Sequence, residues 1–254
     1  MFLRRVALLG VIGLAILLML IAGPRVMAGI ELAAAQDVMR QIRTGHGATF
    51  QGVMHAIDSR RAAARWDVGP RAQAELGEML LTLAALDQPQ AEEMRGELAT
   101  EALTATRAAI LRSPTQPFAW TRYTQALALK TETERLQAGT PVEEGEISPI
   151  DGPLAMAIVT GPWQADLVAT RVEMGLFFWY RLSDFTRRLV AGQIFIGARQ
   201  NPEQLAAVTQ RQNALTEVMA ILLIDDTLLH EFTRVYYRTQ SIDSRREAEG
   251  QGAQ

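Results

Sequence analysis

The sequence predicts an all-α fold in which an N-terminal transmembrane helix is followed by antiparallel helical hairpins. Three observations support this prediction. Apolar residues recur at intervals of three and four over long stretches, turns rich in Pro and Gly separate these stretches, and no segment alternates apolar and polar residues as a strand does. The chain has 254 residues and 48% hydrophobic content, which is enough to bury a core. We expect a transmembrane segment over 1–24, a helical domain over 25–239 and a disordered tail over 240–254.

The N-terminal segment has the composition of a membrane anchor. Arg4 and Arg5 precede seventeen uninterrupted apolar residues, 6–22, and a helix of this length spans roughly 26 Å. A cleaved signal peptide is the alternative, with 26–28 as its cleavage site, but its apolar core is usually shorter. The arginines predict a cytoplasmic N-terminus in a bacterial inner membrane, with the rest of the chain in the periplasm. Pro24 is expected to end this helix.

Ten further helices are expected from periodicity and from helix-terminus signals. Ser183 is the predicted N-cap of one of them, and Asn201 caps the next, with Pro202 in its first turn. The acidic, Gly- and Pro-rich segment 139–153 is expected to be a surface loop or a docking segment. The predicted helices cover 26–43, 49–66, 71–86, 92–112, 120–130, 154–159, 164–181, 183–199, 202–224 and 227–238.

A helical hairpin over 92–130 is the feature around which the rest of the chain is expected to be organised. Small residues mark one face of its first helix, and large aromatic residues mark one face of its second helix. Residues 113–117 contain two prolines and break the periodicity between them. We expect the small residues to receive the rings across the turn. These residues are Ala102, Ala105 and Ala109 on the first helix, and Trp120 and Tyr123 on the second.

This hairpin resembles a degenerate tetratricopeptide repeat (TPR). Two sets of residues match the end of one repeat and the opening of the next. Thr106 and Thr124 depart from the repeat pattern, and no second copy follows at a period of 34 residues. The resemblance implies an array of helical hairpins with a concave binding surface. The matching residues are Ala102, Ala109, Ile110 and Pro114, then Trp120, Tyr123, Ala126 and Leu127.

A looser likeness covers more of the chain. The anchor, the turn from Pro114 to Trp120 and the helix from Arg171 to Leu182 together resemble small membrane-anchored accessory proteins of bacterial exopolysaccharide biosynthesis. That resemblance implies a role in scaffolding or assembly and no known reaction. We therefore expect a membrane-tethered protein-interaction scaffold in polysaccharide assembly or export. The alternative is a structural helical subunit of a larger membrane complex.

Composition and motifs indicate which partners and which kinds of catalytic or metal site the sequence disfavours. The net charge of −3 disfavours nucleic acid as a partner, because phosphate binding needs a basic face. The chain has no cysteine, and its three histidines, His46, His55 and His230, are scattered. His230 and Glu231 begin like a zinc-protease signature, but the fourth residue after His230 is Arg234. We expect no catalytic residue, no cofactor and no metal; an acid–base enzyme without a recognisable motif is the less favoured alternative.

Two further clusters have competing interpretations. Asp225 and Asp226 are a carboxylate pair by sequence, but aspartates at a helix start are more often caps. Phe177, Phe178, Trp179 and Tyr180 cover every side of a helical turn, so they belong to the core or form a patch facing a partner or a membrane surface. The expected partners are the membrane, through 6–22, and other proteins. A small-molecule ligand is left open.

Overall fold

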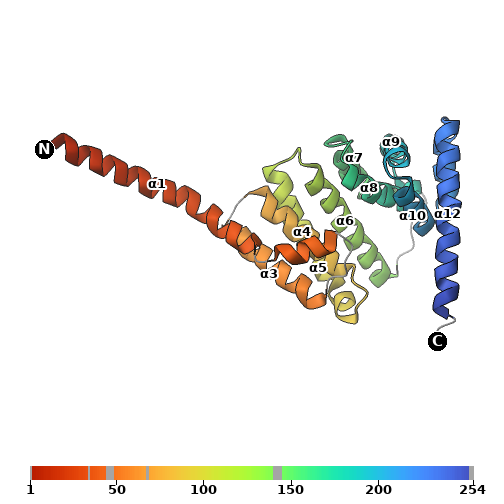
Figure 1. Cartoon of the computed structure of the whole chain (residues 1–254), viewed down its shortest axis with the longest axis horizontal. Helices are drawn as coiled ribbons and strands as arrows, with labels where there is room; N and C mark the ends of the chain where they lie inside the picture. The colour runs from red at the N-terminus through yellow and green to blue at the C-terminus, as the bar shows by residue number, and fades with distance from the viewer. Residues whose placement is uncertain (1, 34, 44–48, 67–68, 140–144, 252–254) are drawn as a thin grey trace. The chain divides into compact units, whose positions relative to one another are not determined.

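The chain is all-helical throughout the residues that the structure, a computed structural model, describes (Figure 1). These are residues 2–33, 35–43, 49–66, 69–139 and 145–251, with side chains described over 10–33, 35–41, 49–66, 69–139 and 145–241. No strand occurs in these ranges. The chain divides into two compact units, 1–114 and 115–254. We describe each unit by itself.

The first unit contains helices that begin where the sequence places turn residues. Pro70 and Pro89 occupy the first turns of α4 and α5, where a missing N–H leaves no hydrogen bond unmade. Helices α4 and α5 form a hairpin that is closely packed at Gly77, since a Cβ there would lie 2.4 Å from Cγ2 of Thr106. The helices are α1 (Phe2–Ala33), α2 (Gln36–Arg43), α3 (Phe50–Trp66), α4 (Pro70–Ala84) and α5 (Pro89–Arg112).

Helix α1 contains the apolar segment. Within it, Gly10–Ala33 is long and apolar enough to cross a bilayer, and almost none of it is buried in the protein. Its last turns pack against the unit, where Ala28 joins Ala63 and Ala72 in a small cluster. The prediction that Pro24 ends this helix is wrong, because α1 continues through it to Ala33. An interior proline removes one backbone hydrogen bond, and the apolar residues on either side still favour a helix.

The second unit has one continuous apolar core. The core draws on every helix from α7 to α12, with the deeply buried Leu154, Val172, Ile194, Leu222 and Phe232 among its members. Helices α8 and α9 approach closely at Gly175, where a Cβ would lie 2.5 Å from Cγ1 of Val190. The helices are α6 (Pro117–Ala138), α7 (Asp151–Val159), α8 (Ala165–Phe177), the 3-10 helix η1 (Trp179–Arg181), α9 (Asp184–Gln200), α10 (Pro202–Arg211), α11 (Leu215–Leu222) and α12 (Asp226–Gln251).

Helix termini in this unit explain where the predictions succeed and where they fail. Ser183 and Asn201 are N-caps, as predicted: their side chains accept hydrogen bonds from the N–H groups of Thr186 and Gln204. The single helix predicted over 202–224 is wrong. Asn213 adopts a left-handed conformation (φ 50°) and the N–H of the next residue reaches back to the carbonyl of Thr209, so α10 ends and α11 begins.

Several other boundaries also differ from the predictions; the predicted helix over 26–43, for example, is divided between α1 and α2. The helix predicted over 164–181 ends at Phe177, and a short 3-10 helix follows it. Where the sequence predicts a disordered tail over 240–254, α12 continues to Gln251. Residues 241–249 contain no glycine or proline and include two Arg and two Glu, which have favourable helix propensity.

The predicted hairpin over 92–130 spans the boundary between the two units. Both of its helices exist, as α5 and α6, with residues 113–116 between them. Ala102 and Thr106 of α5 lie against Gly77 of α4 within the first unit. In the second unit, the rings of Trp120 and Tyr123 pack edge to face, 6.2 Å apart. The packing of the alanines against these rings stays a prediction, and so does the TPR-like arrangement.

Candidate partner-binding surface

An open groove of about 360 Å³ runs along the outer face of α9 in the second unit. One side of the groove is formed by the end of α7 and the turn that follows it, which carries Trp163. The other side is a stripe of residues spaced along α9. Its lining is mostly apolar and includes no acidic residue. The residues that define it are Trp163, Arg188, Leu189, Gly192, Ile196 and Arg199.

Three features of this α9 groove distinguish it from ordinary surface. Trp163 leaves 74% of its surface exposed, which is unusual for the largest apolar side chain. A Cβ at Gly192 would have no atom within 4 Å, so the middle of the groove is open space. Arg188 is exposed and makes no ion pair among the described residues, whereas Arg199 pairs with Asp225 at 3.4 Å. The groove is thus apolar along its length with a cation on its edge.

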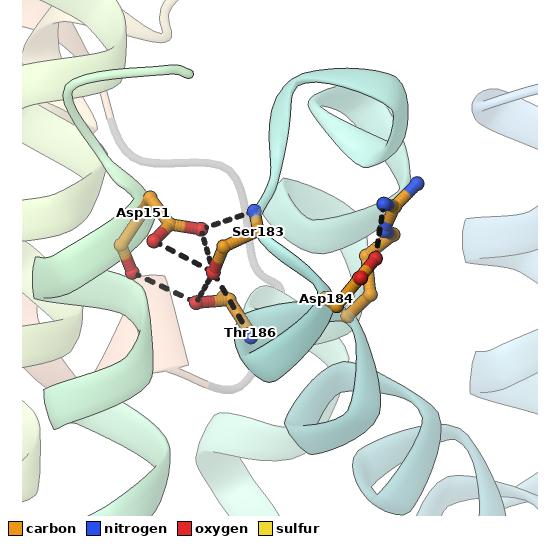
Figure 2. A network of polar contacts seen from close by, with 5 residues as sticks. Asp151, Ser183, Asp184 and Thr186 are labelled. Carbon is orange, nitrogen blue, oxygen red and sulfur yellow. Dashed lines mark hydrogen bonds and ion pairs between the residues drawn. The ribbon is translucent and has the colours of Figure 1, made fainter.

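The N-terminal end of α9 is fixed to α7 by a network of polar contacts (Figure 2). Asp151 lies in the first turn of α7, and its carboxylate accepts hydrogen bonds from the N–H of Ser183 at 2.8 Å and from its hydroxyl at 2.9 Å. The same hydroxyl oxygen caps α9 by accepting from the N–H of Thr186. The Thr186 hydroxyl donates to the carbonyl of Asp151 at 3.4 Å. One carboxylate therefore lies at two helix N-termini, where negative charge is favoured.

A second set of contacts fixes the groove from behind. Arg171 of α8 is completely buried, and its Nη1 donates to the carbonyl of Gly161 at 2.8 Å and to Oε1 of Gln193 at 3.4 Å. Its Nε donates to the hydroxyl of Thr121 on α6 at 3.3 Å. Gln193 in turn donates to the carbonyl of Pro162 at 2.9 Å. These bonds hold the 160–163 turn and α9 in one arrangement.

Arg171 carries its charge without a carboxylate partner in the described part of the chain. Burial lowers its pKa to about 10, and the charge of Asp166 opposes this shift. A pKa of about 10 still leaves the guanidinium charged at neutral pH. Its Nη2 has no hydrogen-bond partner among the described residues. A buried cation held by neutral acceptors is costly to stability, so this side chain is a positioning element that the sequence periodicity did not reveal.

The four predicted aromatic residues do not form one surface. Phe178 is buried in the core, under the guanidinium of Arg181, whose carbon lies 5.6 Å from the ring centroid. Phe177 and Tyr180 are exposed, and Trp179 is half-buried. The chain turns into a 3-10 helix here, and the rings of Phe177 and Phe178 pack edge to face with their centroids 4.8 Å apart. Phe178 therefore belongs to the core, and a partner-facing role for Phe177, Trp179 and Tyr180 stays a prediction.

Tyr180 retains a specific contact outside the core. Its hydroxyl donates to the carboxylate of Glu217 on α11 at 2.5 Å. This hydrogen bond, followed by the charge of Glu217, raises the pKa of Tyr180. The pair links η1 to α11 at the surface and does not reach the α9 groove.

The remaining predicted residues lie apart from one another. His55 and His230 are exposed on α3 and α12, and His46 lies outside the described residues. Asp225 caps α12, because its carboxylate accepts from the N–H of Leu228 at 3.1 Å, as the cap interpretation predicts. In the described part of the chain, no three His, Cys, Asp or Glu side chains gather as metal ligands would.

Other cavities are less suited to a protein partner. A cavity of about 140 Å³ is lined by residues of α8, α9 and α10. In the first unit, a cavity of about 300 Å³ is lined by Arg60, Arg71 and Glu75, but Glu75 already pairs with both arginines, at 3.5 and 2.8 Å. The α9 groove combines greater volume with an apolar lining.

Sequence reasoning missed the groove for a physical reason. Leu189, Gly192 and Ile196 share one face of α9, and this spacing is visible in the sequence. Trp163 meets them only through tertiary packing of the 160–163 turn. Comparison of the chain with protein-family models, with curated proteins and with solved structures finds no match.

Proposed function

We propose that this chain is a membrane-tethered protein-interaction scaffold whose α9 groove receives an apolar segment of a protein partner. The groove itself is the observation that carries the proposal. An open apolar groove along a helix, edged by a charged residue, is the arrangement by which proteins bind helices or short apolar segments. Its volume also falls in the range of ligand pockets. Its lining, however, offers no acid, nucleophile or metal ligand that would favour an enzyme.

The two sets of polar contacts support a preformed binding site. Asp151 and Ser183 fix one end of α9, and Arg171 with Gln193 fixes its middle against the 160–163 turn. A groove whose walls are fixed before binding loses less conformational entropy when a partner arrives. Conversely, buried polar networks lower stability unless their groups are satisfied. Nη2 of Arg171 has no hydrogen-bond partner among the described residues, so we propose that this side chain serves to position the groove walls.

Helix α1 supports the proposal that the chain is tethered to a membrane. Its segment Gly10–Ala33 has the length and apolar character of a membrane span. We propose that it stays attached as an anchor and is not removed as a signal sequence. Arg4 and Arg5 favour a cytoplasmic N-terminus in a bacterial inner membrane, with both units in the periplasm. The proposed context, polysaccharide assembly or export, rests on the resemblance to exopolysaccharide accessory proteins.

Photo-crosslinking in intact cells tests the docking role. Benzoyl-phenylalanine replaces Trp163 in the groove, and the control replaces Tyr237, an exposed aromatic residue on α12. We expect a discrete protein adduct from position 163 and not from position 237. Adducts of equal yield at both positions, or none at position 163, would contradict a docking groove. A constant stoichiometry with one large complex after purification in mild detergent would instead favour a structural subunit.

A further inference from the structure

The turn between α11 and α12 exposes two large apolar side chains beside two carboxylates. Leu223 and Ile224 leave 64% and 83% of their surfaces exposed. Asp225 caps α12 and so fixes the conformation of the turn. Asp226 is exposed and makes no ion pair among the described residues. An ordered turn that presents a Leu-Ile pair to solvent has the character of a binding element and not of an ordinary surface loop.

This α11–α12 turn lies next to the α9 groove. The carboxylate of Asp225 pairs with Arg199, which lines the groove, at 3.4 Å. The turn does not enter the groove of its own chain, because Ile224 is almost fully exposed and its neighbour is held by the α12 cap. Both the groove and the turn are therefore available to another molecule.

The two surfaces are complementary in chemistry. The groove is apolar with open space at Gly192, and the turn supplies two apolar side chains. Arg188 on the edge of the groove and Asp226 beside the turn both lack an ion pair among the described residues. Opposite charges at the rim of an interface favour encounter and fix register. An apolar centre with a polar rim is the usual organisation of such contacts.

From this complementarity we infer that the occupant of the α9 groove is the α11–α12 turn of a second copy of this chain. The inference deepens the proposed function, on which it rests, by naming the partner. Because groove and turn are neighbours, two copies can exchange turns and make the contact twice. Each contact is small, but two chains tethered in one bilayer meet at a high effective concentration. The scaffold would then assemble only where its anchors hold it.

Disulfide crosslinking between two differently tagged full-length chains tests this inference. The chain has no cysteine of its own, so each variant carries a single thiol. One chain carries Gly192→Cys and the other Ile224→Cys, and both are co-expressed and oxidised in native membranes. We expect a disulfide-linked heterodimer. The matched control pairs Gly192→Cys with Leu136→Cys, since Leu136 is another exposed apolar residue of the second unit; a heterodimer no faster in forming than this control would overturn the inference.

A charge exchange separates a lost contact from a misfolded protein. Asp226→Arg in the Ile224→Cys chain should slow crosslinking by about twofold to fivefold, the effect of one exposed ion pair. Arg188→Asp in the other chain should restore the rate, and a misfolded chain would not be rescued. Failure to restore it would overturn the predicted pairing. If the 163 photo-adduct contains a different protein and no heterodimer forms, the scaffold role stands and this inference fails; if the 163 adduct is also absent, both fail.

Discussion

Each unit of the chain buries an arginine, and the two arginines are held in different ways. Arg60 of the first unit lies within 3.5 Å of the carboxylate of Glu75, which Arg71 also contacts. Arg171 of the second unit is held by a carbonyl, an amide oxygen and a hydroxyl, and within the described part of the chain it forms no ion pair with a carboxylate. A carboxylate offsets the desolvation of a buried cation far better than neutral acceptors do. We infer that the main effect of Arg171 is to fix the groove walls, through its bonds to Gly161 and Gln193.

Removal of these two side chains should give the largest effects. Arg171→Ala should cost about 3–5 kcal/mol, because it leaves a cavity and three acceptors without their donor. Arg60→Ala should cost less, since Glu75 keeps its contact with Arg71. Arg171→Met should lower the free energy of unfolding by less than Arg171→Ala does, because methionine keeps most of the side-chain volume and removes the buried charge. Denaturant unfolding, with hydrogen exchange to assign each effect to its unit, measures all three; an equal cost for Arg171→Ala and Arg60→Ala would break the comparison.

Close helix contacts at glycine extend the comparison. Gly175→Ala should cost about 1–3 kcal/mol, because the new Cβ would lie 2.5 Å from Val190. Gly77→Ala should cost a similar amount in the first unit, against Thr106. Thr106→Ser removes the contacting methyl group and should reduce the cost of Gly77→Ala, so the two changes should not be additive. Thermal unfolding of the single and double variants measures this coupling, and strict additivity would mean that the contact at Gly77 is not close.

Gly192→Ala is the matched control for these glycines. It lies inside α9, but a Cβ there meets no atom within 4 Å. We expect it to raise stability by about 0.5–1 kcal/mol, the usual gain when alanine replaces an interior helical glycine. The same thermal unfolding measures it. A loss of stability would show that the middle of the groove is filled and would contradict the open groove.

The contacts of Asp151 should give an intermediate effect. Asp151→Ala removes the acceptor for the N–H and hydroxyl of Ser183 and should cost about 1–2 kcal/mol. Asp151→Asn keeps one acceptor oxygen and should cost less. Hydrogen exchange should localise the loss to the first turns of α7 and α9. Exchange that is unchanged there would mean that the network does not fix α9.

The hydrogen bond from Tyr180 to Glu217 should contribute least to stability, and the pH dependence of Tyr180 tests for it. Its raised folded-state pKa means that the Glu217 bond contributes stability below the ordinary pKa of tyrosine. This contribution is lost as pH rises through the raised folded-state value. In a spectrophotometric titration of the four tyrosines, Tyr180 should ionise late because its pKa is raised. The Tyr180→Phe variant should lack this late step. If Tyr180→Phe lowers the amplitude of the titration curve without changing its shape, the contact with Glu217 is contradicted.

The helices could be predicted from the sequence more reliably than the α9 groove. Proline positions and cap residues such as Ser183 marked helix starts, because these signals are local. Asn213 carried a local signal for the α10–α11 break, since asparagine tolerates the left-handed conformation. The groove could not be predicted, because it arises where tertiary packing brings the 160–163 turn, with Trp163, beside the outer face of α9. The buried Arg171 was equally hidden, since its position on an apolar helix face gives no clue to its acceptors.

Thiol accessibility measures whether a bound segment occupies the α9 groove when the chain is in native membranes. Gly192→Cys in the full-length chain is labelled with a maleimide in native membranes, alongside Leu136→Cys as the exposed reference. Each labelling rate is divided by its rate in denatured protein. We expect Cys at position 192 to react severalfold more slowly than the reference, because a bound apolar segment covers it. Equal normalised rates at the two positions would mean that the groove is empty and would contradict the account.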